Sequence, residues 1–180
     1  NLPSTSELAF GLMINVLRKV HQSYESVKKN KWDYLPYVGR QIKGLNICVI
    51  GYGRLGKIFC KQLIGFGVNV FVVDPYVKKC RYKKLPLTKA MAKADVIAIH
   101  VHLNHATKNL INKHNISKCK KNAIIINTSR GEIVNEKDII LAIKKNKLGG
   151  YGTDVLSNEL NGLNRNPVIK AAKQGLPVLI

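Results

Sequence analysis

Gly51-Tyr52-Gly53-Arg54-Leu55-Gly56 decides the fold, because its glycines have the spacing G-x-G-x-x-G. The β-branched run 46–50 before it predicts a strand, and the run 54–64 after it predicts a helix. In that setting Gly51 permits a tight turn, Gly53 lets the backbone approach a pyrophosphate, and Gly56 lets helix and strand pack closely. The first turn of the helix offers unpaired N–H groups to phosphates. The stretch therefore predicts dinucleotide binding.

An acid stands at the position where such a site binds the adenosine ribose. Asp74 follows the second expected strand, residues 68–73. A carboxylate there accepts hydrogen bonds from ribose hydroxyls and repels a 2′-phosphate, which favours NAD over NADP. The neighbouring cations Lys78, Lys79 and Arg81 act against that preference. The alternative is a glycine-rich turn beside a solvated Asp, but strand, motif, helix, strand and acid in this order favour NAD.

Short apolar runs alternate with helical patterns along the rest of the chain. They predict an α/β fold with a doubly wound, Rossmann-like parallel sheet, preceded by a long N-terminal helix. Ser4 and Glu7 have capping-box spacing at the start of that helix. We assign residues 1–42 to the leading helix and connecting loop, and residues 43–180 to the Rossmann core; the polar stretch of the loop runs from 32 to 44, so its last two residues reach into the core. Further strands are expected at 95–101, 123–127, 151–155 and 177–180, and helices at 88–93, 115–120, 136–145 and 167–173.

Composition narrows the class of protein. The 180 residues are 46% hydrophobic and 22% charged, which is typical of one globular domain and not of a disordered chain. The net charge of +20 suggests nucleic acid, but the cations are mostly scattered Lys, whereas base recognition favours Arg. No apolar run is long enough to cross a membrane, and the first residues do not resemble a signal peptide. Four cysteines without a C-x-x-C pair predict reduced thiols in a cytoplasmic protein.

Three further stretches carry a resemblance to a known family. Residues 95–107 read DVIAIHVHLNHAT, residues 127–136 read NTSRGEIVNE, and residues 149–155 read GGYGTDV. They are similar to the segments D-V-V-S-L-H-x-P-L-T-P-E-T, N-T-A-R-G-x-x-V-D-E and the acid-bearing segment of the D-isomer-specific 2-hydroxyacid dehydrogenases. The chain resembles the nucleotide-binding domain of that family nearly from end to end.

The resemblance implies a role for each matching position. Arg130 would bind the carboxylate of a 2-hydroxy or 2-oxo acid through a bidentate guanidinium pair, which orients the reacting carbon. Glu159 would hydrogen-bond a catalytic histidine that exchanges a proton while hydride moves to or from NAD. Asp154 would lie on the nicotinamide side. The cofactor-binding set is Gly51, Gly53, Arg54, Leu55, Gly56, Asp74, Val101, His102, Thr107, Thr128, Ser129, Arg130 and Asp154.

The sequence also departs from the family pattern. The catalytic histidine normally follows the last strand, and we expect it beyond Ile180; the substrate domain is also expected to be absent from this chain. On its own, the chain should bind NAD without turning over substrate. His100, His102 and His105 have no acid or thiol close in sequence, so no metal site is expected. The family tends to dimerise through this domain, which predicts a homodimer. A non-catalytic NAD(H)-sensing module and a nucleic-acid binder are the alternatives.

Overall fold

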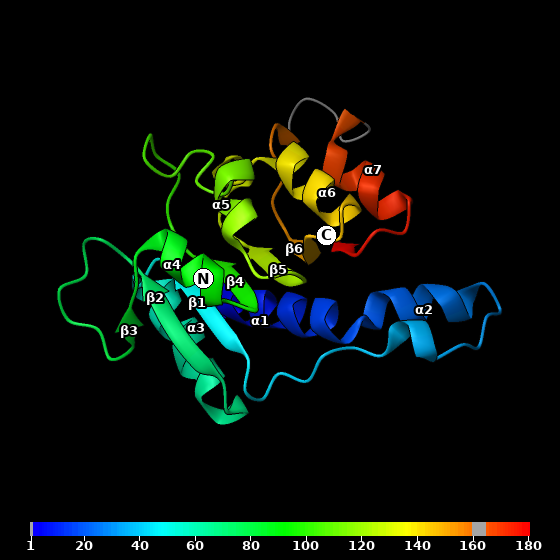
Figure 1. Cartoon of the computed structure of the whole chain (residues 1–180), viewed down its shortest axis with the longest axis horizontal. Coiled ribbons are helices and arrows are strands. Elements are labelled where there is room, and N and C mark those ends of the chain that lie inside the picture. The colour runs from blue at the N-terminus through cyan, green and yellow to red at the C-terminus, as the bar shows by residue number, and fades with distance from the viewer. Residues whose placement is uncertain (1, 160–164) are drawn as a thin grey trace.

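The computed structural model describes residues 2–159 and 165–180 (Figure 1). Within them, seven strands form one sheet in the order β3-β2-β1-β4-β5-β6-β7, and every neighbouring pair is parallel. This arrangement confirms the predicted doubly wound α/β fold. The strands are β1 (Asn46–Ile50), β2 (Asn69–Val73), β3 (Lys83–Lys84), β4 (Val96–Ile99), β5 (Ala123–Asn127), β6 (Leu148–Thr153) and β7 (Val178–Leu179).

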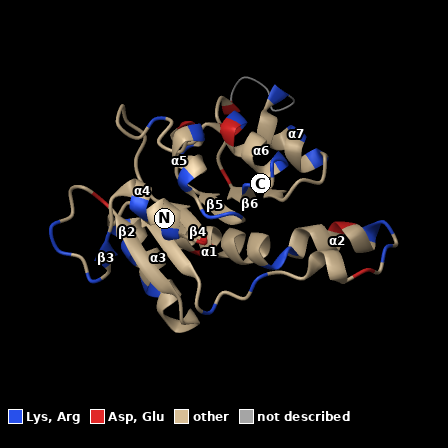
Figure 2. Cartoon of the chain, viewed as in Figure 1, with Lys and Arg blue, Asp and Glu red and all other residues tan. Residues whose placement is uncertain are grey.

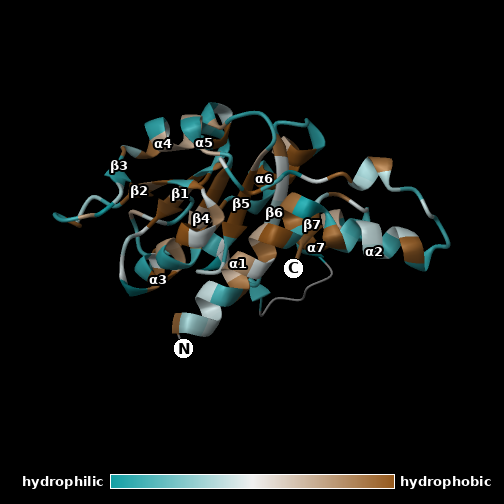
Figure 3. Cartoon of the chain, turned by 90° about the horizontal axis from the view of Figure 1, so that it is seen from below, coloured by the Kyte–Doolittle hydropathy of each residue, from teal (hydrophilic) through white to brown (hydrophobic). Residues whose placement is uncertain are grey.

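Helices cover both faces of the sheet (Figure 3). On one face lie α1 (Leu2–Arg18) and α3 (Arg54–Leu63), which pack against each other. The other face carries α4 (Leu87–Lys93), α5 (Lys113–Lys118), α6 (Glu136–Lys144) and α7 (Pro167–Lys173). In β4, Val96 and Ala98 pack toward the α1 side, and Ile97 and Ile99 toward the α4 side. Central strands buried on both faces explain why their sequences are continuous apolar runs.

The chain order places a binding crevice at one edge of the sheet. From β1 the chain runs outward through β2 to β3, and it then returns to the other side of β1 as β4. The connections that follow β1 and β4 therefore leave in opposite directions. In open α/β sheets, ligands bind outside the carboxyl ends of the strands at this switch point.

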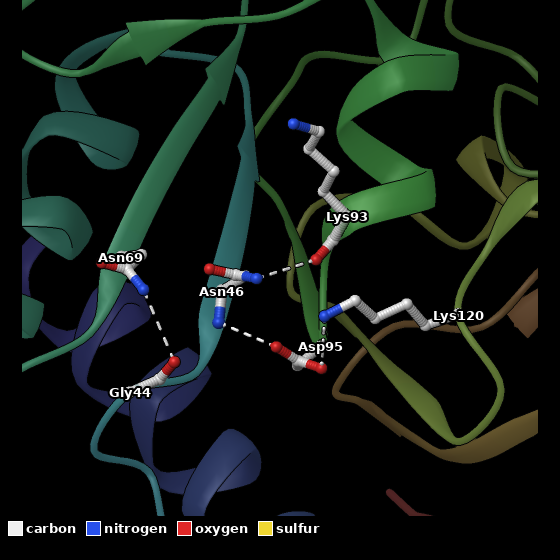
Figure 4. A network of polar contacts seen from close by, with 6 residues as sticks. All are labelled: Gly44, Asn46, Asn69, Lys93, Asp95 and Lys120. Carbon is white, nitrogen blue, oxygen red and sulfur yellow. Dashed lines mark hydrogen bonds and ion pairs between the residues drawn. The ribbon is translucent and has the colours of Figure 1, made fainter.

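The amino ends of the strands are held by a separate polar network (Figure 4). Asp95 accepts hydrogen bonds from the Asn46 N–H at 2.9 Å and from the Lys120 ammonium at 3.0 Å. The Asn46 amide donates to the Lys93 carbonyl at 3.2 Å. This network joins β1, β4 and the segment before β5 at the edge opposite the crevice, so it serves stability.

The N-terminal region differs from the expectation of one helix and a loop. The first helix already includes Leu2, so Ser4 and Glu7 lie inside it, and the predicted capping box is wrong. Pro3 explains this start, because proline is tolerated in the first turn of a helix. The helix breaks at Lys19, whose φ of 55° is left-handed, and a second helix, α2 (Val20–Lys28), follows. The connecting loop contains a short 3-10 turn, η1 (Leu35–Tyr37).

Other element bounds shift by a few residues. β6 begins at Leu148, where the sequence predicts only the end of a helix, because Gly149 and Gly150 belong to the strand. A Cβ at Gly149 would lie 2.5 Å from the Asn122 carbonyl oxygen, so this close approach requires glycine. The two-residue edge strand β3 was not predicted, since its two exposed lysines carry no apolar signal. The remaining short 3-10 turns are η2 (Ile64–Phe66) and η3 (Gly131–Ile133).

Candidate functional site

The glycine turn has the geometry expected of a phosphate-binding turn. Gly51 has a φ of +94°, and a Cβ there would lie 2.5 Å from the His100 carbonyl oxygen. A Cβ on Gly56 would lie 2.0 Å from the Gly51 carbonyl oxygen, so this glycine allows α3 to pack on the turn. A Cβ on Gly53 would meet no protein atom within 4 Å. The space beside Gly53 is therefore open toward the crevice.

The start of α3 is prepared for an anion. Its N-cap is Gly53, no side chain caps the helix, and its first turn contains no acidic residue. The N–H groups of a helix start need partners, and a phosphate satisfies them. Arg54 is exposed and Leu55 is half-buried at this position. The turn, the open space and the uncapped helix fit the pyrophosphate of NAD.

Asp74 lies at the carboxyl end of β2, beside the turn. Its Oδ2 accepts the Tyr52 N–H at 2.8 Å, and its Oδ1 accepts the N–H groups of Tyr76 and Val77 at 2.9 and 3.1 Å. These backbone donors fix the direction of the carboxylate. A cavity of about 540 Å³ opens next to it, and most of its lining is apolar. The size and apolar lining of this cavity fit a group such as adenosine.

The loop after β4 closes this cavity. Val101 and Thr107 line it together with Asp74, Pro75, Leu85 and Leu110. The Thr107 hydroxyl donates to the His102 carbonyl at 2.6 Å, which closes the loop on itself. The His102 side chain is exposed and does not line the cavity.

The turn after β5 is held by hydrogen bonds that involve three neighbouring strands, β4, β5 and β6. Asn127, at the end of β5, accepts the Ser129 N–H at 3.1 Å and donates to the Arg130 carbonyl at 3.0 Å. The Ser129 hydroxyl donates to the Ile99 carbonyl of β4 at 2.8 Å, and the Thr153 hydroxyl of β6 lies 2.8 Å from the Asn127 carbonyl oxygen. Thr128 and Ser129 are both buried.

Arg130 and Glu159 both lie near Asp154 at this edge. Arg130 is exposed, and its guanidinium donates to the Ser129 carbonyl at 2.6 Å. Glu159 accepts the Leu156 N–H at 2.7 Å, which folds its loop back toward β6. Burial and the nearby Glu159 carboxylate raise the pKa of Asp154, while the Arg130 guanidinium lowers it. Asp154 thus lies within electrostatic reach of both residues.

Gly131 and Glu136 belong to this arrangement although the sequence did not predict a role for them. A Cβ on Gly131 would lie 2.1 Å from the carbonyl carbon of Leu156 and 2.2 Å from the Ser157 nitrogen. Glu136 accepts the Ser157 N–H at 2.7 Å. Both residues follow Arg130 within residues 127–136, the stretch that resembles the family segment. Their contacts join segments far apart in sequence, which no local pattern reveals.

His100 is the buried histidine of the three after β4. It is 8% exposed, its ring lies 4.8 Å from that of Phe59, and burial lowers its pKa to about 4. His102 and His105 are exposed instead, so the three do not form one site. In the described part of the chain, no three His, Cys, Asp or Glu side chains are grouped to hold a metal. No described helix is long and apolar enough to span a membrane.

The lysines are spread over the surface (Figure 2). One basic segment follows β2 and includes the loop to β3, beside the cavity that Asp74 lines. The four cysteines are free, and three of them are buried. Burial raises the pKa of Cys48 and Cys60 to about 12, so both thiols stay protonated at neutral pH.

Comparisons with known proteins agree with this geometry. Residues 10–175 match the family described as D-isomer specific 2-hydroxyacid dehydrogenase, NAD binding domain. The chain is 35% identical over 168 residues to 2-hydroxyacid dehydrogenase A of Aspergillus oryzae, covering 88% of this chain and 48% of that protein. It is 32% identical over 164 residues to D-3-phosphoglycerate dehydrogenase of Bacillus subtilis, covering 88% and 31%. The chain therefore spans half or less of these relatives.

A solved structure shows the same fold with the cofactor bound. The NAD complex of a formate dehydrogenase from Staphylococcus aureus superimposes with a TM-score of 0.89 at 25% identity. The match covers 94% of this chain and 52% of that one. With the family match, the glycine turn and the parallel sheet, we conclude that the chain belongs to the NAD-binding domains of the D-isomer-specific 2-hydroxyacid dehydrogenases.

Proposed function

We propose that this chain is the NAD-binding part of an oxidoreductase that transfers hydride between NAD(H) and a 2-hydroxy or 2-oxo acid. The observation that carries this proposal is that Arg130 and Glu159 lie within electrostatic reach of Asp154, at the sheet edge that also carries the uncapped start of α3. The enzyme names of its relatives support it. In domain terms, residues 1–42 form the leading segment and residues 43–180 the dinucleotide-binding core.

Each residue has a proposed task. The N–H groups at Gly53, Arg54 and Leu55 bind the pyrophosphate, and Asp74 binds the adenosine ribose. Val101 and Thr107 contact the adenosine, while His102, Thr128 and Ser129 contribute backbone to the groove. Asp154 holds the nicotinamide end. When bound, NAD⁺ would accept the hydride and NADH would donate it.

At the substrate end of the site, two charged side chains, Arg130 and Glu159, have proposed roles. Arg130 binds the substrate carboxylate with its planar guanidinium, which orients the reacting carbon. Glu159 supports a histidine outside this chain, which takes or gives the hydroxyl proton. A carboxylate next to an imidazole favours the charged imidazolium, so Glu159 makes the proton donor available for reduction of a 2-oxo acid.

We further propose a cytoplasmic homodimer. An arm formed by α2 and the following loop exposes large apolar side chains, among them Trp32, which is 90% exposed. Patches of this kind mark protein interfaces. The arm presents Tyr24, Val27, Trp32, Tyr34, Leu35 and Val38. Buried, free thiols are consistent with a reducing compartment.

Two measurements test the function. The first titrates NADH into the 180-residue chain and follows its fluorescence; binding that arbitrary DNA does not displace is expected. The second sequences the gene across both ends of the chain and assays the whole product for NADH oxidation with pyruvate, glyoxylate or hydroxypyruvate. Turnover that Arg130→Gln lowers by about a hundredfold supports the enzyme. Binding without turnover would favour an NAD(H)-sensing module.

A further inference from the structure

Glu136 is a buried acid to which the proposed reaction gives no task. It is the first residue of α6 and only 5% exposed. Its Oε1 accepts the Ser157 N–H at 2.7 Å, and its Oε2 accepts the Asn166 side-chain amide at 2.8 Å. Neither of the two ion pairs between described residues includes it. Its charge is therefore held by hydrogen bonds alone, and buried charges require such partners.

The two donors lie on either side of Glu159 in the sequence. Ser157 belongs to the turn in which Glu159 accepts the Leu156 N–H. Asn166 donates a second hydrogen bond to the Ser157 carbonyl at 3.3 Å and caps α7 by accepting the Val168 N–H at 2.8 Å. One carboxylate thus binds both the Glu159 turn and the start of α7.

The same turn contacts the Arg130 segment. The Gly131 backbone packs directly on Leu156 and Ser157, and Glu136 follows Gly131 through the short turn η3. The Glu159 turn therefore contacts the Gly131 backbone and is hydrogen-bonded to the Glu136 carboxylate through Ser157. Displacement of either contact changes the distance from Glu159 to Arg130 and Asp154.

We propose that Glu136 is a positioning residue, which holds the Glu159 turn against the Arg130 segment. This inference rests on the proposed function, because it assigns Glu159 and Arg130 to one reaction site. A carboxylate is needed because both of its oxygens accept. A glutamine amide offers only one acceptor and would turn its NH₂ group toward a donor.

Asp154 reports on the position of Glu159. The Glu159 carboxylate raises the pKa of Asp154 and the Arg130 guanidinium lowers it. If the Glu159 turn moves away, the pKa of Asp154 falls. A general loss of stability does not produce that change while the chain remains folded. The Asp154 titration therefore separates positioning from a purely structural role.

The experiment follows the Asp154 carboxyl by carbon NMR in the 180-residue chain. Variants are Glu136→Gln, Glu159→Gln as the reference for a missing charge, and Asn166→Ser. The last removes one donor but leaves the Glu136 charge, and serine still caps a helix. The control is Asp138→Asn, an acid in the same helix turn that accepts the Lys113 N–H at 2.8 Å instead.

We expect Glu136→Gln and Asn166→Ser to lower the pKa of Asp154 in the same direction as Glu159→Gln. Amide exchange at Ser157 should speed up by about tenfold or more in Glu136→Gln, because a hydrogen bond to a charged group is lost. Asp138→Asn should change neither readout. An unchanged Asp154 titration in folded Glu136→Gln, or in Asn166→Ser if the first variant does not fold, overturns the proposal. Failure of the proposed function appears separately, as loss of NADH binding by the unaltered chain.

Discussion

Gly131 and Leu156 touch through their backbones, with room for no side chain between them: a Cβ on Gly131 would lie 2.1 Å from the Leu156 carbonyl carbon. The segment that carries Arg130 and the turn that carries Glu159 come from opposite sides of α6 in the sequence. This contact is the point where they meet. The geometry of the candidate site thus depends on the absence of one methyl group.

Gly131→Ala should therefore destabilise the chain strongly. The added methyl cannot be placed without moving backbone, and such overpacking costs about 1–3 kcal/mol or more. Urea denaturation measures the loss. The matched control is Gly11→Ala in α1, where an added Cβ meets nothing within 4 Å. It should be neutral or stabilise by up to about 1 kcal/mol, since alanine favours helix. If Gly131→Ala and Gly11→Ala are equally stable, the close backbone contact between Gly131 and Leu156 is contradicted.

Asp74→Asn should weaken discrimination against NADPH. The amide keeps the shape of the side chain but removes the charge that repels a 2′-phosphate. The asparagine NH₂ group would also face a backbone N–H group that now donates a hydrogen bond to the Asp74 carboxylate. We expect the ratio of NADPH to NADH dissociation constants to fall by about tenfold, as for the loss of one charged contact. Fluorescence titration with both cofactors measures it, and Asp33→Asn, outside the cofactor cavity, is the control. An unchanged ratio of the two dissociation constants would show that Asp74 does not bind the ribose.

His100 should make the fold sensitive to acid. Burial lowers its pKa to about 4, below the ordinary value of 6.5 that it regains on unfolding. Between these values the unfolded chain binds a proton that the folded chain does not. The stabilisation is complete above pH 6.5 and falls as the pH drops toward 4, by up to about 3 kcal/mol.

His100→Gln removes this titration. Urea midpoints between pH 8 and pH 4.5 should fall less steeply in that variant than in the unaltered chain. His102→Gln, an exposed neighbour, should follow the unaltered chain. Parallel profiles for the unaltered chain and His100→Gln would show that His100 is not buried as described.

Asp95→Ala should lower stability without changing cofactor binding. It leaves the Asn46 N–H and the Lys120 ammonium without their acceptor, at a cost of about 1–3 kcal/mol. The network lies at the amino edge of the sheet, opposite the glycine turn. We expect a lower urea midpoint and an unchanged NADH dissociation constant. Lys93→Ala is the control, because Lys93 joins the network through its carbonyl alone. A weakened NADH affinity would show that the two edges are coupled.

The sequence predicted the sheet because its strands carry strong local signals. Runs such as Ile124-Ile125-Ile126 are buried on both faces, which is typical of central parallel strands. The break at Lys19 was not predictable, since lysine has no preference for left-handed φ. The edge strand β3 was missed for a similar reason: its pairing with β2 is decided by neighbours in space, not by its two lysines.

The site was predictable where residues act through their own backbone or charge. Gly51 and Gly56 show the close contacts that their motif implies, and these follow from local sterics. The burial of the Thr128 hydroxyl could not be predicted, because Thr128 follows a strand that is buried on both faces and no alternation marks its side chain. The contact of Glu136 with Ser157 joins residues twenty-one positions apart. Whether a buried acid binds a distant loop depends on tertiary packing, which sequence pattern does not record.

The uncapped start of α3 has a practical consequence for handling the protein. Because its first turn has no acid and the whole chain has a net charge of +20, we expect this helix end to attract small multivalent anions. Phosphate or sulfate buffers should therefore occupy the same N–H groups as the cofactor, raise the apparent melting temperature and compete in titrations. Buffers with monovalent, weakly bound anions will report the cofactor affinity more faithfully.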